Sequence, residues 1–340
     1  MRAPGHDNRP RTMKLATLKD GSRDGQLAVV SRDLAIAHLA DSIAPTLQRA
    51  LDDWSFIAPQ LAELAQALEQ GKTRNAFSFD PRRCMAPLPR AYQWLDGAAY
   101  APHLERLTRA RGAELPAHYG KVPMIYQGAS DDFLGAHDAA VFDAQDHAID
   151  LEAEIAVIVD DLPMGATAAR CAERIRLVTL VNDWSLRAFA ADELAAGFGL
   201  LRTKPATAFA PVAVTPDELG ASWHDGLVHL PVIVHCRGRR VGQANAGADA
   251  MFNFDRLLAH AATTRNLRAG TILGGGTVSN HDPALGWSCI AEARAIETLA
   301  QGGAQTEFLA FGDRVRIEVF DEHGASVFGA IDQEVVARPR

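Results

Sequence analysis

Three carboxylates lie near the ends of two apolar runs. Their type and spacing suggest that they bind a cation. Glu152 and Glu154 lie two residues apart in I-D-L-E-A-E-I-A-V-I-V, and Asp183 ends the run L-V-T-L-V-N-D. Alternate side chains of a strand share a face, so we expect the two glutamates to be neighbours. Repulsion and desolvation would destabilise such a pair unless a positive charge lay between them. Oxygen ligands without cysteine or histidine favour Mg²⁺, Ca²⁺ or Mn²⁺ over zinc.

Each of these acids also has a simpler interpretation. A strand with Ala153 and Ile155 facing inward would leave both glutamates exposed to solvent. Asp183 could cap a helix that begins at Ser185. The three acids together favour a cation site over these separate interpretations.

The elements that must position these acids belong to a mixed α+β body. Strand-like runs cover residues 149–159, 175–183, 227–236 and 315–320, and helices are expected near 166–174, 185–196 and 250–263. Strands and helices that do not alternate regularly argue against a doubly wound sheet. A run of glycines at 274–276 predicts a tight loop beside the site, where backbone approaches closely.

A small α+β unit is expected ahead of this body, over residues 13–80. Two short apolar runs around a Gly/Asp turn predict a hairpin at its start. Leucines then recur at three- and four-residue steps over 47–68, and we expect Pro59 to divide this helical stretch into two. Residues 1–12 are interpreted as a flexible extension, 81–95 as a proline-rich linker and 96–335 as the catalytic domain.

Composition excludes several classes of function. The chain has 340 residues, of which 48% are apolar and 22% charged, with a formal net charge of −8. This composition is globular rather than disordered, and it offers no basic surplus for binding nucleic acid. We expect no membrane span, because the longest stretch without charged residues is short and rich in glycine. Four scattered cysteines without a C-x-x-C pair fit a reducing cytoplasm.

The acidic segments resemble the metal-binding signature of the fumarylacetoacetase (FAA hydrolase) family. D-L-E-A-E followed by L-V-N-D-W-S-L-R carries the resemblance, and further segments match in the family's order. These are M-I-Y-Q-G-A-S with Tyr126, G-L-L-R-T-K-P-A-T with Lys204, N-L-R-A-G-T-I-L-G-G-G-T-V-S-N with Thr277, and the later acid Glu292. The resemblance implies a mixed β-roll catalytic domain preceded by a small α+β amino-terminal domain.

The resemblance also implies roles for individual residues. Asp96 would join the three carboxylates as a fourth metal ligand, and His103, which follows it at the family's spacing, would be the general base. Glu292 would orient His103, and Lys204 would lie near a developing oxyanion or a substrate carboxylate. The substrate itself would be bound by Tyr126, Thr277, Tyr100 and one of Arg109 and Arg111.

Two positions depart from the family pattern. Ala190 stands where the family has a glutamine that helps hold the substrate oxyanion, and Ala98 where it has a substrate-contacting tyrosine. Both departures affect the expected identity of the substrate more than the expected class of reaction.

The implied function is metal-dependent hydrolysis of a C–C bond in a diketo acid. The leading substrate is fumarylacetoacetate, an intermediate of tyrosine degradation, which would give fumarate and acetoacetate. The alternatives are an acylpyruvate hydrolase, a decarboxylase, hydratase or isomerase of a small 2-oxo acid, and a metal-binding scaffold without catalysis. The expected cofactor is Mg²⁺ or Ca²⁺, with Mn²⁺ as a further candidate, and the expected partners are the small acid and a second copy in a homodimer.

Overall fold

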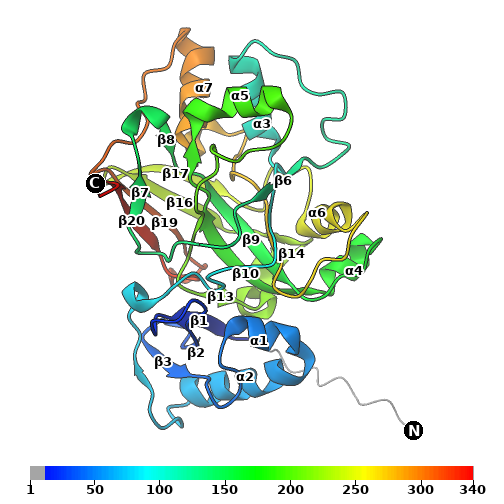
Figure 1. The fold of residues 1–340 in the computed structure, drawn as a ribbon, viewed down its shortest axis with the longest axis vertical. Coiled ribbons are helices and arrows are strands. Elements are labelled where there is room, and N and C mark those ends of the chain that lie inside the picture. Colours follow the sequence, from blue (N-terminus) through cyan, green and yellow to red (C-terminus); the bar gives the residue numbers. More distant parts are fainter. Residues whose placement is uncertain (1–11, 340) are drawn as a thin grey trace.

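The computed structural model describes residues 12–339 (Figure 1). The extension expected over residues 1–12 therefore lies, except for Thr12, outside the described residues. A small unit formed by the first strands and helices lies at one end of the molecule, and α3, α5 and α7 lie at the other. The mixed α+β class with a small amino-terminal domain is confirmed.

The small unit contains the predicted hairpin. Its elements are β1 (Lys14–Leu18), β2 (Gln26–Val30), β3 (Ile36–Leu39), α1 (Leu47–Asp52), α2 (Trp54–Glu69) and β4 (Phe77–Ser78). β1 and β2 pair antiparallel. The expectation that Pro59 divides the helical stretch is wrong. The chain leaves helical geometry at Asp53 instead, with φ −138° and ψ 45°, and α2 continues through Pro59 while packing its apolar face into a core.

The candidate carboxylates lie on or directly beside strands of an eleven-stranded sheet that includes the strands of the small unit. Its order is β4-β3-β2-β1-β13-β10-β9-β18-β5-β6, with β12 paired to β10. The strands beyond the small unit are β5 (Trp94–Gly97), β6 (Ile125–Gly128), β9 (Ala153–Val159), β10 (Ile175–Asn182), β12 (Ala208–Phe209), β13 (Ala213–Val214) and β18 (Ile272–Gly274). β13 pairs with both β1 and β10, so hydrogen bonds join the two parts of the chain directly.

A second sheet of five strands completes the body. It consists of β17 (Arg239–Asn245), β16 (Pro231–Cys236), β19 (Arg314–Val319), β20 (Ile331–Ala337) and β7 (Ala140–Phe142), in that order. Two short pairs are β8 (Ile149–Asp150) with β11 (Ser185–Leu186), and β14 (Trp223–His224) with β15 (Leu227–Val228). The helices are α3 (Ala101–Ala110), α4 (Ala168–Ala172), α5 (Ala190–Ala196), α6 (Phe254–Ala261) and α7 (Ile290–Gln301). Short 3₁₀ segments cover Pro81–Arg83, Gln145–His147, Arg187–Phe189, Pro216–Ser222 and Pro283–Leu285, and the fourth is kinked at Gly220.

Three predicted elements are interrupted. The strand expected over 149–159 breaks between β8 and β9, and the strand expected over 227–236 breaks before Pro231. The helix expected over 185–196 begins only at Ala190, because Ser185–Leu186 pairs with β8 as a strand. Tertiary pairing thus overrides the local pattern at the place where the chain leaves the acidic site.

β9 is buried on both faces, which removes the exposed-strand interpretation of the glutamates. Every residue of β9 is buried, with Ile155 and Val157 in one apolar cluster and Ala156 and Ile158 in the other. Glu152, just ahead of the strand, is 4% exposed and Glu154 is fully buried. The simpler interpretation, in which both glutamates face solvent, is therefore wrong.

Candidate active site

Three carboxylates converge where neighbouring strands of the large sheet come together. Asp96 lies on β5, Glu154 on β9 and Asp183 directly after β10, and one oxygen of each lies within 4.8 Å of the others. β18 separates β5 from β9, and its last residue, Gly274, has no side chain to keep them apart. A Cβ there would lie 2.4 Å from Asp96 Oδ1 and 3.1 Å from Glu154 Oε2. Gly274 thus ends a strand rather than belonging to the tight loop expected over 274–276, but its missing side chain does let the backbone pass close to these carboxylates.

Burial and mutual repulsion define the electrostatics of this carboxylate trio. Burial, with the nearby Asp183, raises the pKa of Asp96 to about 8. Burial and Asp96 together raise the pKa of Glu154 well above its usual value. Neither carboxylate oxygen of Glu154 receives a hydrogen bond from the described residues. Three buried acids, one of them without a donor, are the arrangement that a hard divalent cation would stabilise. The residues of the trio therefore fit the predicted metal.

Glu152 lies in a different environment from Glu154, although the two are separated by one residue. Lys204 donates through Nζ to Glu152 Oε2 and, at 2.5 Å, to Asp183 Oδ2. Arg187 donates to Glu152 Oε1 and, at 2.9 Å, to Asp150 Oδ2. Burial disfavours the charged form of Glu152, but the two cations outweigh it and lower the pKa. The role of Glu152 as a ligand of the same cation stays a prediction.

Asp183 is held from three sides rather than capping a helix. Besides the contact with Lys204, its Oδ2 accepts a hydrogen bond from the Tyr126 hydroxyl, and its Oδ1 accepts one from Thr207 at 2.7 Å. Burial and the nearby Asp183 raise the pKa of Tyr126, so the phenol keeps its proton. The helix-cap interpretation of Asp183 is wrong, since Ser185 continues into a strand.

His103 and Glu292 form a second part of the site, on helices α3 and α7. His103 Nδ1 lies 3.5 Å from Glu292 Oε2. The other carboxylate oxygen accepts from Arg106 and, at 2.6 Å, from Ser279. Burial raises the pKa of Glu292, but the hydrogen bonds from His103, Ser279 and Arg106 outweigh it, so the net shift is downward. Arg294, two residues after Glu292 on α7, donates to the carbonyl of Thr306 instead.

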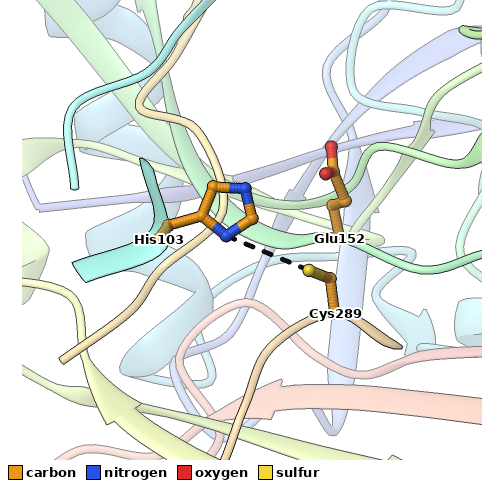
Figure 2. Close-up of side chains that lie close together, drawn as sticks. All are labelled: His103, Glu152 and Cys289. Atoms are coloured by element: carbon orange, nitrogen blue, oxygen red, sulfur yellow. Dashed lines mark hydrogen bonds between the residues drawn. The ribbon is translucent and has the colours of Figure 1, made fainter. Parts of the chain in front are cut away.

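Glu152 connects the two parts of the site. One of its oxygens lies within 4.8 Å of a ring nitrogen of His103 and of the sulfur of Cys289. Figure 2 shows the His103 ring facing Cys289, whose Sγ lies 4.0 Å from Nδ1. The predicted base and the predicted ligands therefore lie in one continuous cluster.

The predicted substrate-binding residues differ in how close they lie to the carboxylates. Thr277 is buried and follows Gly276, whose N–H donates to Asp96 Oδ1 at 3.1 Å. Gly276 has φ +83°, and a Cβ there would lie 2.2 Å from the carbonyl oxygen of Gly97, so only glycine fits. Tyr100 is buried and its hydroxyl donates to the carbonyl of Ala246 at 2.7 Å.

The two candidate arginines lie at the exposed end of α3. Arg109 pairs with Glu105 on the same helix at 3.5 Å, and Arg111 is the C-cap residue. Arg106, one turn after His103, is the arginine of this helix that reaches Glu292. Ala98 and Ala190 are half-buried and bring no polar side chain.

Sequence reasoning did not single out four residues that the fold brings to the site. These are Arg106, Arg187, Thr207 and Cys289. Arg106 could have been found, because residues three apart share a helix face and His103 was already a candidate. Arg187 lay within the acidic signature itself. Cys289 and Thr207 carried no signal before the fold was known.

Two family models match the chain. A model described as the fumarylacetoacetate (FAA) hydrolase C-terminal domain matches residues 93–336, and one described as fumarylacetoacetase N-terminal domain 2 matches residues 13–90. The chain belongs to the fumarylacetoacetate hydrolase family. A comparison with curated proteins finds no match.

Solved structures of hydrolases and isomerases share this FAA hydrolase fold. Maleylpyruvate hydrolase from Sphingobium sp. SYK-6 is 15% identical, with a TM-score of 0.63. Fumarylacetoacetate hydrolase from Exiguobacterium antarcticum is 14% identical, with a TM-score of 0.61, and 5-carboxymethyl-2-hydroxymuconate delta-isomerase from Mycobacterium smegmatis is 17% identical, with a TM-score of 0.59. Each match covers 96% of this chain and 100% of the other. Among the described residues, no helix has the length and apolar character needed to span a bilayer.

Proposed function

We propose that this member of the family is a metal-dependent hydrolase that cleaves a C–C bond in a diketo acid. The reaction we favour converts fumarylacetoacetate and water into fumarate and acetoacetate. The supporting observation is that Glu152, which lies beside His103 and shares the Lys204 ammonium with Asp183, links the His103–Glu292 pair to a buried trio of carboxylates. A water-activating base and a cation site must lie side by side for this chemistry.

His103 is the proposed base. With a proton on Nδ1 directed at Glu292, its Nε2 is left as the acceptor for a proton from water. The lowered pKa of Glu292 keeps that carboxylate charged near neutral pH, where it stabilises the imidazolium formed when His103 takes the proton. Arg106 and Ser279 hold the carboxylate in place.

Lys204 and Arg187 supply the fixed positive charge. The acidic partners Asp183 and Glu152 raise the pKa of Lys204, although burial opposes this, so its ammonium stays charged where negative charge develops on the substrate. Tyr126 is the proposed donor to a substrate carboxylate. Asp96, Glu154 and Asp183 would hold a divalent cation, which when bound supplies Lewis-acid polarisation and orientation of the two diketone oxygens.

An isomerase, hydratase or decarboxylase of a small 2-oxo acid is the second candidate, along with an acylpyruvate hydrolase. Ala190 supports the isomerase, hydratase or decarboxylase, because no amide side chain stands at this position to hold the oxyanion of a hydrolytic intermediate. A homodimer that uses Mg²⁺, Ca²⁺ or Mn²⁺ remains part of the proposal.

The test is a panel of three diketo acids and one 2-oxo acid, whose consumption is followed by the loss of diketone or 2-oxo-acid absorbance under saturating Mg²⁺. The panel contains fumarylacetoacetate, fumarylpyruvate, maleylpyruvate and oxaloacetate. His103→Ala should lower turnover of the preferred acid by at least about 100-fold, the smallest usual contribution of a general base. Its affinity for Mg²⁺, measured by calorimetry, should stay near the wild-type value.

The control is His323→Ala, which removes an exposed imidazole from a surface turn. Full hydrolase activity in His103→Ala would refute the assignment of the base. Formation of an isomer rather than two fragments would favour the second candidate, and no consumption of any acid would favour a non-catalytic metal scaffold.

A further inference from the structure

A second group of potential metal ligands lies beside the carboxylate trio and differs from it in chemistry. His103 offers an imidazole nitrogen, Cys289 a sulfur and Glu152 a carboxylate oxygen, all within 4.8 Å of one another. They come from α3, from the residue that precedes α7 and from the residue that precedes β9 (Figure 2). Cys289 and Glu152 are buried, whereas the His103 side chain is 12% exposed, which gives a route from solvent.

The donor set selects for a particular class of metal. Nitrogen and sulfur together with one oxygen suit Zn²⁺ and related transition metals, whereas Mg²⁺ and Ca²⁺ prefer oxygen alone. The trio of Asp96, Glu154 and Asp183 offers only oxygen. The two adjacent groups would therefore take different cations.

The geometry needs only a small adjustment. Two ligands of one tetrahedral zinc, a nitrogen at about 2.05 Å and a sulfur at about 2.3 Å, lie about 3.6 Å apart. His103 Nδ1 and Cys289 Sγ lie 4.0 Å apart. Glu152 can join them while keeping its ion pairs, because each carboxylate oxygen that accepts from Lys204 or Arg187 has a second lone pair.

The thiol of Cys289 lies in a position that can stabilise a bound thiolate. It caps the twelve-residue helix α7, where Sγ accepts the N–H of Glu292 at 3.3 Å. Burial raises the pKa of the free thiol well above its ordinary value, so the group is protonated without metal. On binding, the S–H bond breaks, a sulfur–metal bond forms and the proton passes to solvent, with no oxidant required.

We propose that His103, Glu152 and Cys289 form an inhibitory site for Zn²⁺ or a similar borderline metal. The inhibitory part rests on the proposed function of His103 as the base. A metal on Nδ1 occupies the lone pair of that nitrogen and leaves the single ring proton on Nε2, so neither nitrogen can accept a proton from water. Among the described residues, no other cysteine belongs to such a group of ligands.

The binding test uses Co²⁺ as a spectroscopic probe for zinc, with protein already saturated with Mg²⁺. Wild-type protein should bind Co²⁺ with a sulfur-to-cobalt charge-transfer absorption that Zn²⁺ displaces. Cys289→Ser should lose this absorption, and its Zn²⁺ affinity should fall at least about 100-fold, the upper end of what loss of an outer-shell partner costs. Serine also caps helices well, so the fold should persist. Cys171→Ser, which removes a buried thiol on α4, should bind as wild type does.

The activity test follows diketone cleavage under saturating Mg²⁺. Zn²⁺ should inhibit the wild type, and Cys289→Ser should be resistant. If no diketo acid is consumed, the proposed function fails, while the cobalt spectrum still decides the metal site. The proposed metal site would be refuted if the wild type showed no sulfur-to-cobalt absorption. It would also be refuted if Cys289→Ser kept that absorption. X-ray absorption of the zinc-loaded wild type, which should show one sulfur neighbour, tests the site without any substitution.

Discussion

Glu152 and Glu154 show how environment, rather than residue type, sets the behaviour of a carboxylate. Arg187 and Lys204 flank Glu152 and lower its pKa, whereas the other acids raise the pKa of Glu154. Desolvation acts on both in the same direction, so the neighbouring charges decide the difference. Glu154 is therefore the carboxylate that most needs a cation.

Glu154→Gln should weaken Mg²⁺ binding at least about 100-fold, since a direct ligand contributes more than an outer-shell partner. The same change should raise the melting temperature of the metal-free protein at neutral pH, because the raised pKa of Glu154 makes folding oppose the ionisation of this acid, a cost that the uncharged amide does not carry. Calorimetry and thermal unfolding measure the two effects. The control is Glu173→Gln, at an exposed carboxylate that pairs with Arg170. Unchanged Mg²⁺ affinity in Glu154→Gln would contradict the metal site.

Arg106 illustrates the difference between a buried and an exposed ion pair. Its partner Glu292 is fully buried and Arg106 itself is mostly buried. Arg106→Met should lower the free energy of unfolding by about 3 kcal/mol, because it leaves a buried carboxylate without its cation. Arg109→Met, one turn further along α3, removes an exposed pair with Glu105 and should cost less than about 1 kcal/mol. Urea unfolding of both variants makes the comparison, and equal losses would contradict the burial argument.

At the scale of elements, helix α5 fixes residues 201–203, which directly precede Lys204, through hydrogen bonds. Glu193 on α5 accepts hydrogen bonds from the N–H groups of Leu201, Arg202 and Thr203 and from the Thr203 hydroxyl. These bonds, the one from Arg202 first, lower the pKa of Glu193 to about 2. One carboxylate thus fixes the turn ahead of Lys204, the proposed oxyanion-stabilising lysine.

Glu193→Gln should give several-fold faster amide exchange at Leu201–Thr203, because an amide is a weaker acceptor than a carboxylate. In the wild type the stabilisation is complete above pH 4.5, the ordinary value, and is lost as pH falls through about 2. Hydrogen exchange read by mass spectrometry measures both effects. Asp192→Asn, at the exposed neighbouring position on α5, is the control. Equal exchange in the two variants would show that Glu193 does not hold the turn.

At the scale of the whole molecule, one sheet runs through both family domains. β1 pairs with β13, and Leu15 on β1 packs in an apolar cluster with Leu177 and Phe209 of the catalytic body. Hydrogen bonds and core packing both cross the boundary, so we expect the two parts to unfold together.

Leu15→Ala should lower the free energy of unfolding by about 2–5 kcal/mol, the usual cost of a large-to-small change in a core. The loss should appear equally in peptides from α2 and from β9 when exchange is followed through a denaturant series. Leu299→Ala, at a half-exposed position of α7, should change stability little. Earlier unfolding confined to α2 would contradict a single cooperative unit.

The sequence alone determined the fold class, the hairpin, the family resemblance and the acids of the site. These follow from local composition, from periodicity and from short motifs that lie close together in the chain. It failed at the break between β8 and β9 and at the start of α5, because pairing between β8 and β11 replaced the local preference. The sequence pattern also predicted a helix break at Pro59. In the structure α2 continues through Pro59, because its apolar face packs into a core.

Tertiary structure alone decided which charges share a site. Glu154 meets Asp96 across a glycine, while Glu152 meets His103, Lys204 and Cys289, although only Ala153 separates the two glutamates. No spacing in the sequence distinguishes them, because the direction of each side chain depends on where β9 begins. The sequence supplied the carboxylates, and the packing of strands and helices around them decided the partner of each.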